Sequence, residues 1–232
     1  MNRTAGRLSP SLRVLSPGAF AWVRGVMFAA ALIPLARLFY LGFNDGLGAN
    51  PAEFVVRSLG TWTLVFLCLT LAITPARVLT GWAWLVRLRR MLGLFCFFYV
   101  VLHASSYLWL DQWFDLAAVW TDVLKRPFIT AGFAAFVMLI PLAATSTNAM
   151  VKRLGARRWQ ALHKFVYAIA LAAILHYFWH KASKNDFSEV SIYAAVIAVL
   201  LGFRLVRYAV ARYGSSVSPA NSSAAVSRRR IS

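Results

Sequence analysis

The sequence predicts an all-α protein: a polytopic membrane bundle of six transmembrane helices with the N- and C-termini in the cytoplasm. The first observation is composition. Hydrophobic residues make up 60% of the 232-residue chain and charged residues only 14%, whereas a soluble domain is about half apolar and about a quarter charged. The second observation is that the apolar residues form six long stretches, and a membrane span needs about 20 such residues. The third is that charge alternates between successive loops.

The six predicted spans are residues 21–41, 54–74, 91–110, 127–144, 160–179 and 190–207. The first is kept as a span rather than a cleaved signal peptide, because its apolar stretch is long and no small-residue cleavage site closes it. We therefore expect a cytoplasmic N-terminal segment at residues 1–20, the six-helix domain at 21–210, and a disordered basic cytoplasmic tail at 211–232.

Basic residues concentrate in one set of loops, and the acidic residues fall only in the other. The basic residues that flank the spans include Arg3, Arg7, Arg13, Arg77, Arg87, Arg89, Arg90, Lys152, Arg153, Arg157, Arg158, Arg207 and Arg212. All seven acidic residues, Asp45, Glu53, Asp111, Asp115, Asp122, Asp186 and Glu189, fall in the alternate loops. The positive-inside rule makes the basic side cytoplasmic. Membrane orientation thus explains the net charge of +18, and we expect no nucleic-acid partner.

The chain holds four histidines, and all of them lie in or beside predicted spans. Ionisable residues inside a membrane are costly and are functional by default, and neutral imidazole is a common ligand of haem iron. Counting 1.5 Å per residue from the cytoplasmic ends of their spans, His103 lies ~18 Å deep, His176 ~24 Å and His163 ~5 Å. His103 and His176 therefore reach a comparable level in the outer half of the bilayer.

This matched depth predicts a b-type haem with His103 and His176 as its axial iron ligands. The alternative is two buried histidines that are hydrogen-bonded to carbonyl groups. His163 fits a second haem or other cofactor contact and a structural role equally. His180, one turn beyond His176, could substitute as a ligand, contact a propionate or lie at the interface, and it stays unassigned. No loop exceeds ~17 residues, so no soluble catalytic domain and no catalytic residue is predicted.

Three stretches resemble a known family. They are RSLGTWTLVFLCLTLAITPAR, RRMLGLFCFFYVVLHASSY and TSTNAMVKRLGARRWQALHKFVYAIALAAILHYFW. They are similar to the MsrQ (formerly YedZ) family, the haem-binding membrane subunits of the bacterial protein-methionine-sulfoxide reductase system, within the ferric-reductase-like transmembrane superfamily. The resemblance covers residues 20–210, and the histidines of the family fall on His103, His163 and His176.

The resemblance implies a multi-pass protein of the bacterial inner membrane. It implies that electrons pass from the quinone pool, through haem b and with flavin mononucleotide (FMN) as a further cofactor, to a periplasmic molybdopterin enzyme, MsrP. That partner, bound as a heterodimer, carries the active site and reduces methionine sulfoxide in oxidised envelope proteins. The chain itself would be an electron-transfer subunit.

One departure from the wider superfamily bears on the number of haems. Two-haem relatives carry a second histidine on the third span, where this chain has Arg89 and Arg90. Arginine stays protonated and is a poor iron ligand. A second haem would have only His163 as an evident ligand, so we expect one haem and leave a second open.

Several basic residues are candidate contacts for cofactors. Arg89, Arg90, Lys152, Arg157 and Arg158 form a cytoplasmic collar that could bind the FMN phosphate or a quinone headgroup, or could reflect membrane orientation alone. Arg37 and Arg57, near the outer face, could pair with haem propionates, and Arg37 could equally snorkel to the interface.

Two further functions stay open from the sequence. One is a stand-alone transmembrane ferric or cupric reductase, which would need a nicotinamide or flavin domain from a partner. The other is a haem-free transporter or membrane-assembly protein, which would leave the matched depth of His103 and His176 as a coincidence.

Overall fold

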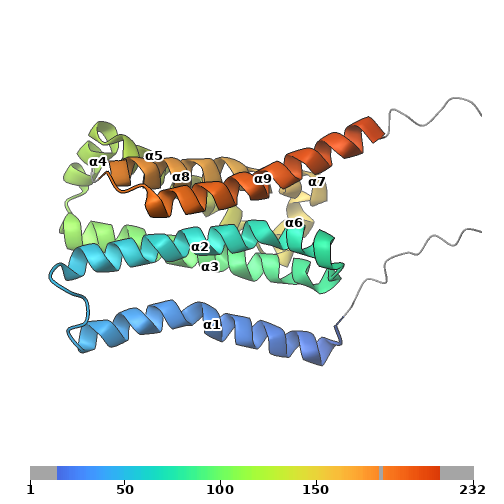
Figure 1. Ribbon diagram of the computed structural model, residues 1–232, viewed down its shortest axis with the longest axis horizontal. Coiled ribbons are helices and arrows are strands. Elements are labelled where there is room, and N and C mark those ends of the chain that lie inside the picture. Colours follow the sequence, from blue (N-terminus) through green and yellow to red (C-terminus); the bar gives the residue numbers. More distant parts are fainter. Residues whose placement is uncertain (1–14, 183–184, 215–232) are drawn as a thin grey trace, which may run out of the picture.

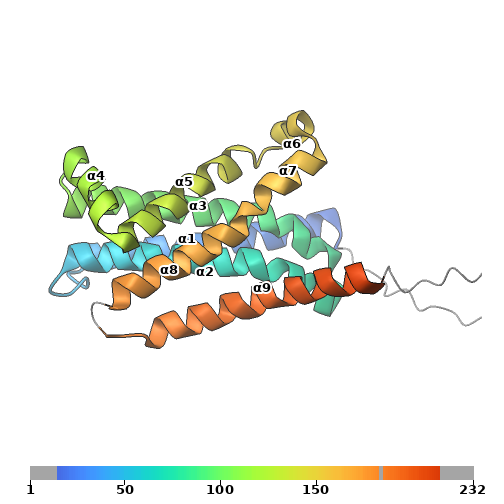
Figure 2. The same ribbon diagram turned by 90° about the horizontal axis from the view of Figure 1, so that it is seen from above.

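Six long helices run roughly parallel to one axis in the computed structural model, which describes residues 15–182 and 185–214 (Figures 1 and 2). The helical elements are α1 (Pro17–Phe43), α2 (Pro51–Thr80), the 3₁₀ helix η1 (Ala83–Leu88), α3 (Arg89–Ser106), the π-helical segment η2 (Tyr107–Asp111), α4 (Leu116–Lys125), α5 (Pro127–Ala144), α6 (Asn148–Leu154), α7 (Ala156–His163), α8 (Phe165–Ala182) and α9 (Ser188–Gly214).

The prediction of six membrane-spanning helices is confirmed. Six segments are long and apolar enough to cross a bilayer: Pro17–Phe43, Pro51–Thr80, Ala83–Asp111, Pro127–Ala144, Ala156–Ala182 and Ser188–Tyr213. The fourth matches its predicted bounds, and the others extend beyond them by one to eight residues at either end, most at the start of the third span. The chain is thus a multi-pass membrane protein. Within the predicted terminal segments, α1 begins at Pro17 and α9 continues to Gly214; residues 1–14 and 215–232 lie outside the described residues.

Local chemistry sets several helix ends. Proline occupies the first helical position of α1, α2 and α5, where its missing N–H costs nothing. Ser16 and Asn50 cap α1 and α2 by accepting hydrogen bonds from the backbone N–H groups of Ala19 and Glu53. Gly81 ends α2 in the left-handed conformation at φ 73°, which glycine adopts without steric cost.

Two antiparallel helix pairs form the centre of the bundle. α2 packs along α3, and α5 packs along α8, and these are the two most extensive helix contacts. α9 lies against α2 and α8, while α1 runs beside α2 and α3 on the other side (Figure 1). The bundle therefore brings the third span, on α3, toward the fifth, on α8.

An aromatic cluster packs α1 against the α2–α3 pair. The side chain of Tyr99 on α3 is fully buried and donates a 2.8 Å hydrogen bond to the carbonyl of Ala31 on α1. Its ring stacks on Phe66 of α2 at 5.2 Å between centroids. Phe95, one turn earlier on α3, contacts Phe28 of α1 at 5.2 Å.

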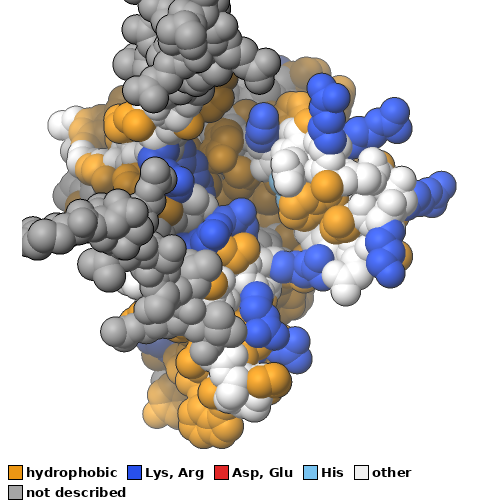
Figure 3. Space-filling view, turned by 90° about the vertical axis from the view of Figure 1, so that its right-hand side faces the viewer, with side chains coloured by type: hydrophobic (Ala, Val, Ile, Leu, Met, Phe, Trp, Pro, Cys, Tyr) orange, Lys and Arg blue, Asp and Glu red, His pale blue; other side chains and the backbone are white. Residues whose placement is uncertain are grey.

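Charge separates the two ends of the bundle. The acidic end holds the α1–α2 turn, α4 and the α8–α9 connection, and all seven acidic residues lie there. The basic end holds the α2–α3 connection, α6, α7 and both described chain termini (Figure 1). Figure 3 looks onto the basic end and shows many Lys and Arg side chains and no acidic side chain on the described residues in view.

Two spans contain irregular backbone that the sequence did not predict. α3 passes into the π-helical turn Tyr107–Asp111 one turn after His103, and such turns are frequent at functional sites. The fifth span breaks at Lys164, where α7 ends and α8 begins. Both irregularities lie next to histidines that the sequence singled out.

Candidate haem-binding site

His103 on α3 and His176 on α8 face each other across the bundle. Their ring centroids lie 6.2 Å apart, and the ring planes make an angle of 79°. The two side chains come from different helix pairs, because α3 packs on α2 and α8 packs on α5. The prediction that these two histidines reach a comparable level on facing helices agrees with this contact, and their role as iron ligands stays a prediction.

Each ring is held by a hydrogen bond from Nδ1. His103 Nδ1 lies 2.8 Å from the carbonyl oxygen of Val56, and His176 Nδ1 lies 2.6 Å from the carbonyl oxygen of Phe128. A carbonyl oxygen only accepts, so Nδ1 carries the proton in each ring and Nε2 carries the lone pair. Neither Nε2 makes a hydrogen bond with the described residues. A neutral imidazole oriented through Nδ1–H is the state in which histidine binds metals.

A glycine lies against each imidazole. A methyl group placed on Gly60 would come within 3.1 Å of His103 Cε1, and one placed on Gly132 within 2.6 Å of His176 Nδ1. Gly60 follows Val56 by four residues, and Gly132 follows Phe128 by four, so each ring bonds a carbonyl one turn before the glycine over which it lies. The two helix pairs thus hold their histidines in the same way.

The geometry fits a haem with two imidazole ligands. Because a metal–imidazole bond is about 2 Å long and a ring centre lies about 1 Å behind its nitrogen, two imidazoles on one metal have centres about 6 Å apart. The observed separation is 6.2 Å. Among the described residues no group of three or more His, Cys, Asp or Glu side chains could hold a metal ion. Two imidazoles suffice for haem iron, since the porphyrin supplies four further ligands.

His163 lies in a different environment, at the α7–α8 break. Its ring stacks on Trp159 at 3.9 Å between centroids and 26° between planes, and its Nδ1 lies 3.0 Å from the carbonyl oxygen of Trp159. The Trp159 indole N–H donates in turn to the carbonyl of Thr145 at 2.9 Å. The Nε2 atom of His163 is buried and has no hydrogen-bond partner among the described residues. The imidazole is therefore oriented, with one nitrogen available.

His180 shares an aromatic neighbour with His176. The ring of Phe128 lies 6.0 Å from His176 and 5.7 Å from His180, between centroids. His180 thus borders the facing pair without taking the place of either ring, and its role stays unassigned.

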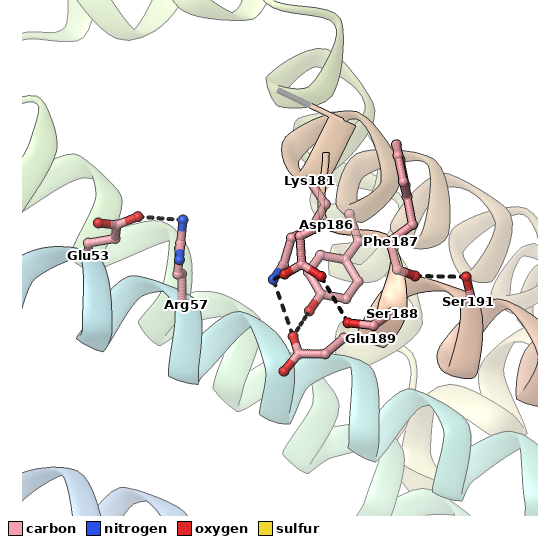
Figure 4. A network of polar contacts seen from close by, with 9 residues as sticks. Glu53, Arg57, Lys181, Asp186, Phe187, Ser188, Glu189 and Ser191 are labelled. Carbon is pink, nitrogen blue, oxygen red and sulfur yellow. Dashed lines mark hydrogen bonds and ion pairs between the residues drawn. The ribbon is translucent and has the colours of Figure 1, made fainter. Parts of the chain in front are cut away.

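The arginines predicted near the outer face differ from each other. Arg57 follows Val56 in α2 and forms an ion pair with Glu53, while its buried Nε atom has no hydrogen-bond partner among the described residues. Figure 4 shows this pair and, apart from it, the network of Lys181, Asp186 and Glu189 at the acidic end. Arg37 is exposed on α1 and makes no hydrogen bond or ion pair with the described part of the chain.

The collar of basic residues is only partly brought together. Arg89 Nη2 donates to Thr74 Oγ1 at 2.7 Å, whereas Arg90 Nη1 donates to Asn148 Oδ1 at 2.6 Å. These neighbours in sequence therefore join different elements, α2 and α6. Lys152, Arg157 and Arg158 lie on α6 and α7, where the side chains of Arg157 and Arg158 are exposed.

Sequence reasoning missed several residues of the site. Gly60, Gly132 and the carbonyls of Val56 and Phe128 were not singled out, nor was Trp159 as a stacking partner. A glycine inside a helix can have a packing reason, but Gly25 and Gly202 are also helical and meet nothing within 4 Å, so glycine alone did not mark the site. Nor did the carbonyls, because only the helix packing selects them.

Comparison with known proteins defines the class. Residues 59–174, which contain His103 and His163 and end two residues before His176, match the model of the family described as "Ferric reductase like transmembrane component". The chain is thus a ferric-reductase-like transmembrane protein. The matched region includes all of α3 and α5 and parts of α2 and α8, the helices of the two pairs.

Similar proteins narrow the class further. The chain is 61% identical over 192 residues to a protein of Ralstonia nicotianae, with 83% of this chain and 88% of that protein covered. It is 57% identical to one of Herminiimonas arsenicoxydans (82% and 87% covered) and 55% identical to one of Bordetella pertussis (84% and 94%). All three are named "Protein-methionine-sulfoxide reductase heme-binding subunit MsrQ". The chain belongs to the MsrQ family.

Proposed function

We propose that this chain is the haem-binding membrane subunit of a methionine-sulfoxide reductase, with one haem b held between His103 and His176. The observation that carries the proposal is the pair of Nδ1-anchored imidazoles with centres 6.2 Å apart. The relatives named as haem-binding subunits support it at 55–61% identity.

Neighbouring residues orient each of the two imidazole rings. Val56 and Phe128 fix the tautomer and the plane of the rings, and Gly60 and Gly132 leave room for them. With both axial positions filled, a haem has no open position for oxygen or substrate and supplies one-electron transfer. Arg57, next to Val56 and with a buried unpaired Nε, is placed to bind a propionate.

We further propose that the basic end faces the cytoplasm and the acidic end the periplasm of the bacterial inner membrane. The support is the charge separation of Figure 3 together with the positive-inside rule. Both termini then lie in the cytoplasm, and residues 21–210 form the membrane domain between the cytoplasmic segments 1–20 and 211–232.

The remaining parts of the proposal rest on the family resemblance. Electrons enter from the quinone pool, with FMN as a further cofactor, and leave to a periplasmic molybdopterin partner, MsrP, which repairs oxidised envelope proteins. The word "subunit" in the relatives' names supports a partner enzyme. His163, with its buried free Nε2 near the basic end, is the residue of this chain best placed for a second haem or other cofactor contact.

A reconstitution tests the proposal against its alternatives. The purified chain is placed in liposomes with a reduced quinone and a periplasmic molybdopterin methionine-sulfoxide reductase, and oxidised methionine is followed by mass spectrometry. We expect quinol-dependent repair that the His103→Ala and His176→Ala variants lose. Rapid reduction of ferric chelates without repair would instead identify a stand-alone metal reductase. Absence of a haem absorption band would favour a transporter or assembly protein.

A further inference from the structure

Two guanidinium groups meet at one hydroxyl group near the basic end. Arg89 of α3 donates to Thr74 Oγ1 at 2.7 Å, and Arg204 of α9 donates to the same atom at 3.2 Å. The sequence did not single out Arg204. We call this group of three residues the Thr74 site.

A proline explains why Arg204 reaches into the bundle. Pro75 has no N–H, so the carbonyl of Leu71, four residues earlier in α2, lacks its helical partner. Arg204 Nη2 donates to that carbonyl at 2.8 Å. Leaving the carbonyl unpaired inside a membrane would be costly. The link to Leu71 therefore accounts for Nη2 of Arg204 and for the packing of α9 on α2.

The link to Leu71 does not account for the rest of the Thr74 site. Arg204 Nη1 is buried and has no hydrogen-bond partner among the described residues. The Thr74 hydroxyl accepts two hydrogen bonds but donates none within the described chain, whereas Thr63, Thr70 and Thr80 on the same helix each donate to the carbonyl four residues before. Buried hydrogen-bond donors such as Arg204 Nη1 are normally paired with an acceptor.

The charge of the Thr74 site is also uncompensated. Two positive guanidiniums stand side by side, and all seven acidic side chains lie at the opposite end of the bundle. The π face of Tyr167, 5.3 Å from the Arg204 guanidinium carbon, is the one aromatic ring described over it. A like-charge pair that lacks a counter-ion is destabilising unless an anion joins it.

We infer that the Thr74 site binds a phosphate group. A phosphate has the charge and the acceptor oxygens that two arginines and a hydroxyl match. Thr74 lies six residues before the end of α2, or about 9 Å below the basic end, and Arg89 is exposed. The phosphate therefore belongs to a molecule that reaches this depth from the basic side: an anionic phospholipid of that leaflet, or the FMN of the proposed function. Basic pockets between helices on the cytoplasmic side commonly hold lipid headgroups.

The experiment uses the full chain, purified and reconstituted in nanodiscs. One arm compares phosphatidylglycerol with phosphatidylcholine nanodiscs and counts phospholipids that stay bound on detergent extraction, by native mass spectrometry. The other arm titrates FMN and follows its fluorescence. The variants are Arg204→Gln and Thr74→Val, and the matched control is Arg207→Gln, which removes an exposed charge from the same helix.

Either of two results supports the inference. Retention of phosphatidylglycerol, or binding of FMN, should weaken about tenfold in Arg204→Gln and measurably in Thr74→Val, with Arg207→Gln like the wild type. Equal binding of both probes by the wild type and both variants would overturn it and leave water as the occupant. Thr74→Val keeps the hydrogen bond from Arg204 to the Leu71 carbonyl. If Arg204→Gln fails to fold, the binding measured with Thr74→Val therefore tests the phosphate site. The haem absorption of each variant is measured in parallel. A variant that keeps its haem but loses phosphate binding shows that the phosphate site has failed and the proposed haem site has not. Only the FMN arm rests on the proposed function.

Discussion

The imidazole planes of His103 and His176 lie at 79° to each other, with their centroids 6.2 Å apart. Each plane is set by its own helix pair, through the carbonyls of Val56 and Phe128. The angle is thus a property of the two pairs rather than of any contact between the rings. It makes the electronic state of the proposed haem predictable.

Near-perpendicular axial imidazoles predict a highly anisotropic low-spin signal. The oxidised wild-type protein should show a single strongly shifted low-field feature in its electron paramagnetic resonance spectrum at liquid-helium temperature, because perpendicular ligand planes leave the iron d orbitals nearly degenerate. A rhombic low-spin spectrum, typical of parallel imidazoles, would mean that the rings rotate away from the carbonyls that hold them here.

Substitution of Gly132 should disturb the His176 side of the site. A methyl group there would lie 2.6 Å from His176 Nδ1, so the ring must move and its bond to Phe128 must lengthen. Overpacking of this kind costs about 1–3 kcal/mol. We expect Gly132→Ala to lower haem content and the midpoint of thermal unfolding in detergent.

Alanine substitutions at two other glycines provide the comparison for Gly132→Ala. Gly60→Ala should have a smaller effect, since its closest approach to His103 is 3.1 Å. Gly93→Ala, where the nearest atom is Thr70 Cγ2 at 3.8 Å, should leave haem content unchanged. Alanine favours a helix over glycine, so helix propensity cannot cause haem loss, and equal loss in Gly93→Ala and Gly132→Ala would show that the effect does not come from room for the imidazole.

His163→Ala should leave the proposed haem in place. His163 lies 13 residues before His176, or about 20 Å along the helix axis, and the arginines at the facing level of α3 bond Thr74 and Asn148. We expect one haem per chain in both wild type and variant, measured by pyridine haemochrome assay against protein concentration. A wild-type ratio of two that falls to one in His163→Ala would establish a second haem.

The α8–α9 connection should stabilise the fold in a pH-dependent way. Hydrogen bonds from Lys181 and Ser188 hold the pKa of the Asp186 carboxyl below its usual value. A carboxylate with a lowered pKa stabilises the folded state above its unfolded pKa, and this contribution is lost as the pH falls through the folded value.

The measurement is the unfolding midpoint of wild type and Asp186→Asn from neutral pH downward. The wild type should be slightly more stable at pH 7, because exposed ion pairs contribute little, and the two should converge below the ordinary aspartate pKa. A difference that persisted unchanged in acid would assign the effect to something other than the carboxylate charge.

Much of the fold follows from the sequence because bilayer thickness and charge placement constrain it strongly. The span at 127–144 was predicted to the residue, and proline together with the arginine before it marks its start. The π-helical turn at 107–111 and the break at Lys164 were not predicted. Both are responses of the backbone to packing and carry no distinctive composition.

The site was predictable only at the level of its chemically distinctive residues. His103 and His176 could be paired by depth, because rise per residue is fixed in a helix. The rotation of each helix is set by packing, so the carbonyls of Val56 and Phe128 and the role of Arg204 could not be foreseen. The collar of basic residues illustrates the same limit, since Arg89 and Arg90 are adjacent in sequence and bond different helices.

The most direct test of the paired-histidine site is the reduced-minus-oxidised absorption spectrum of the detergent-purified protein. The wild type should show a six-coordinate b-type haem, His103→Ala and His176→Ala should each lose it, and His180→Ala should keep it. A full-strength six-coordinate haem in both the His103→Ala and the His176→Ala protein would contradict the assignment of these two imidazoles as the iron ligands.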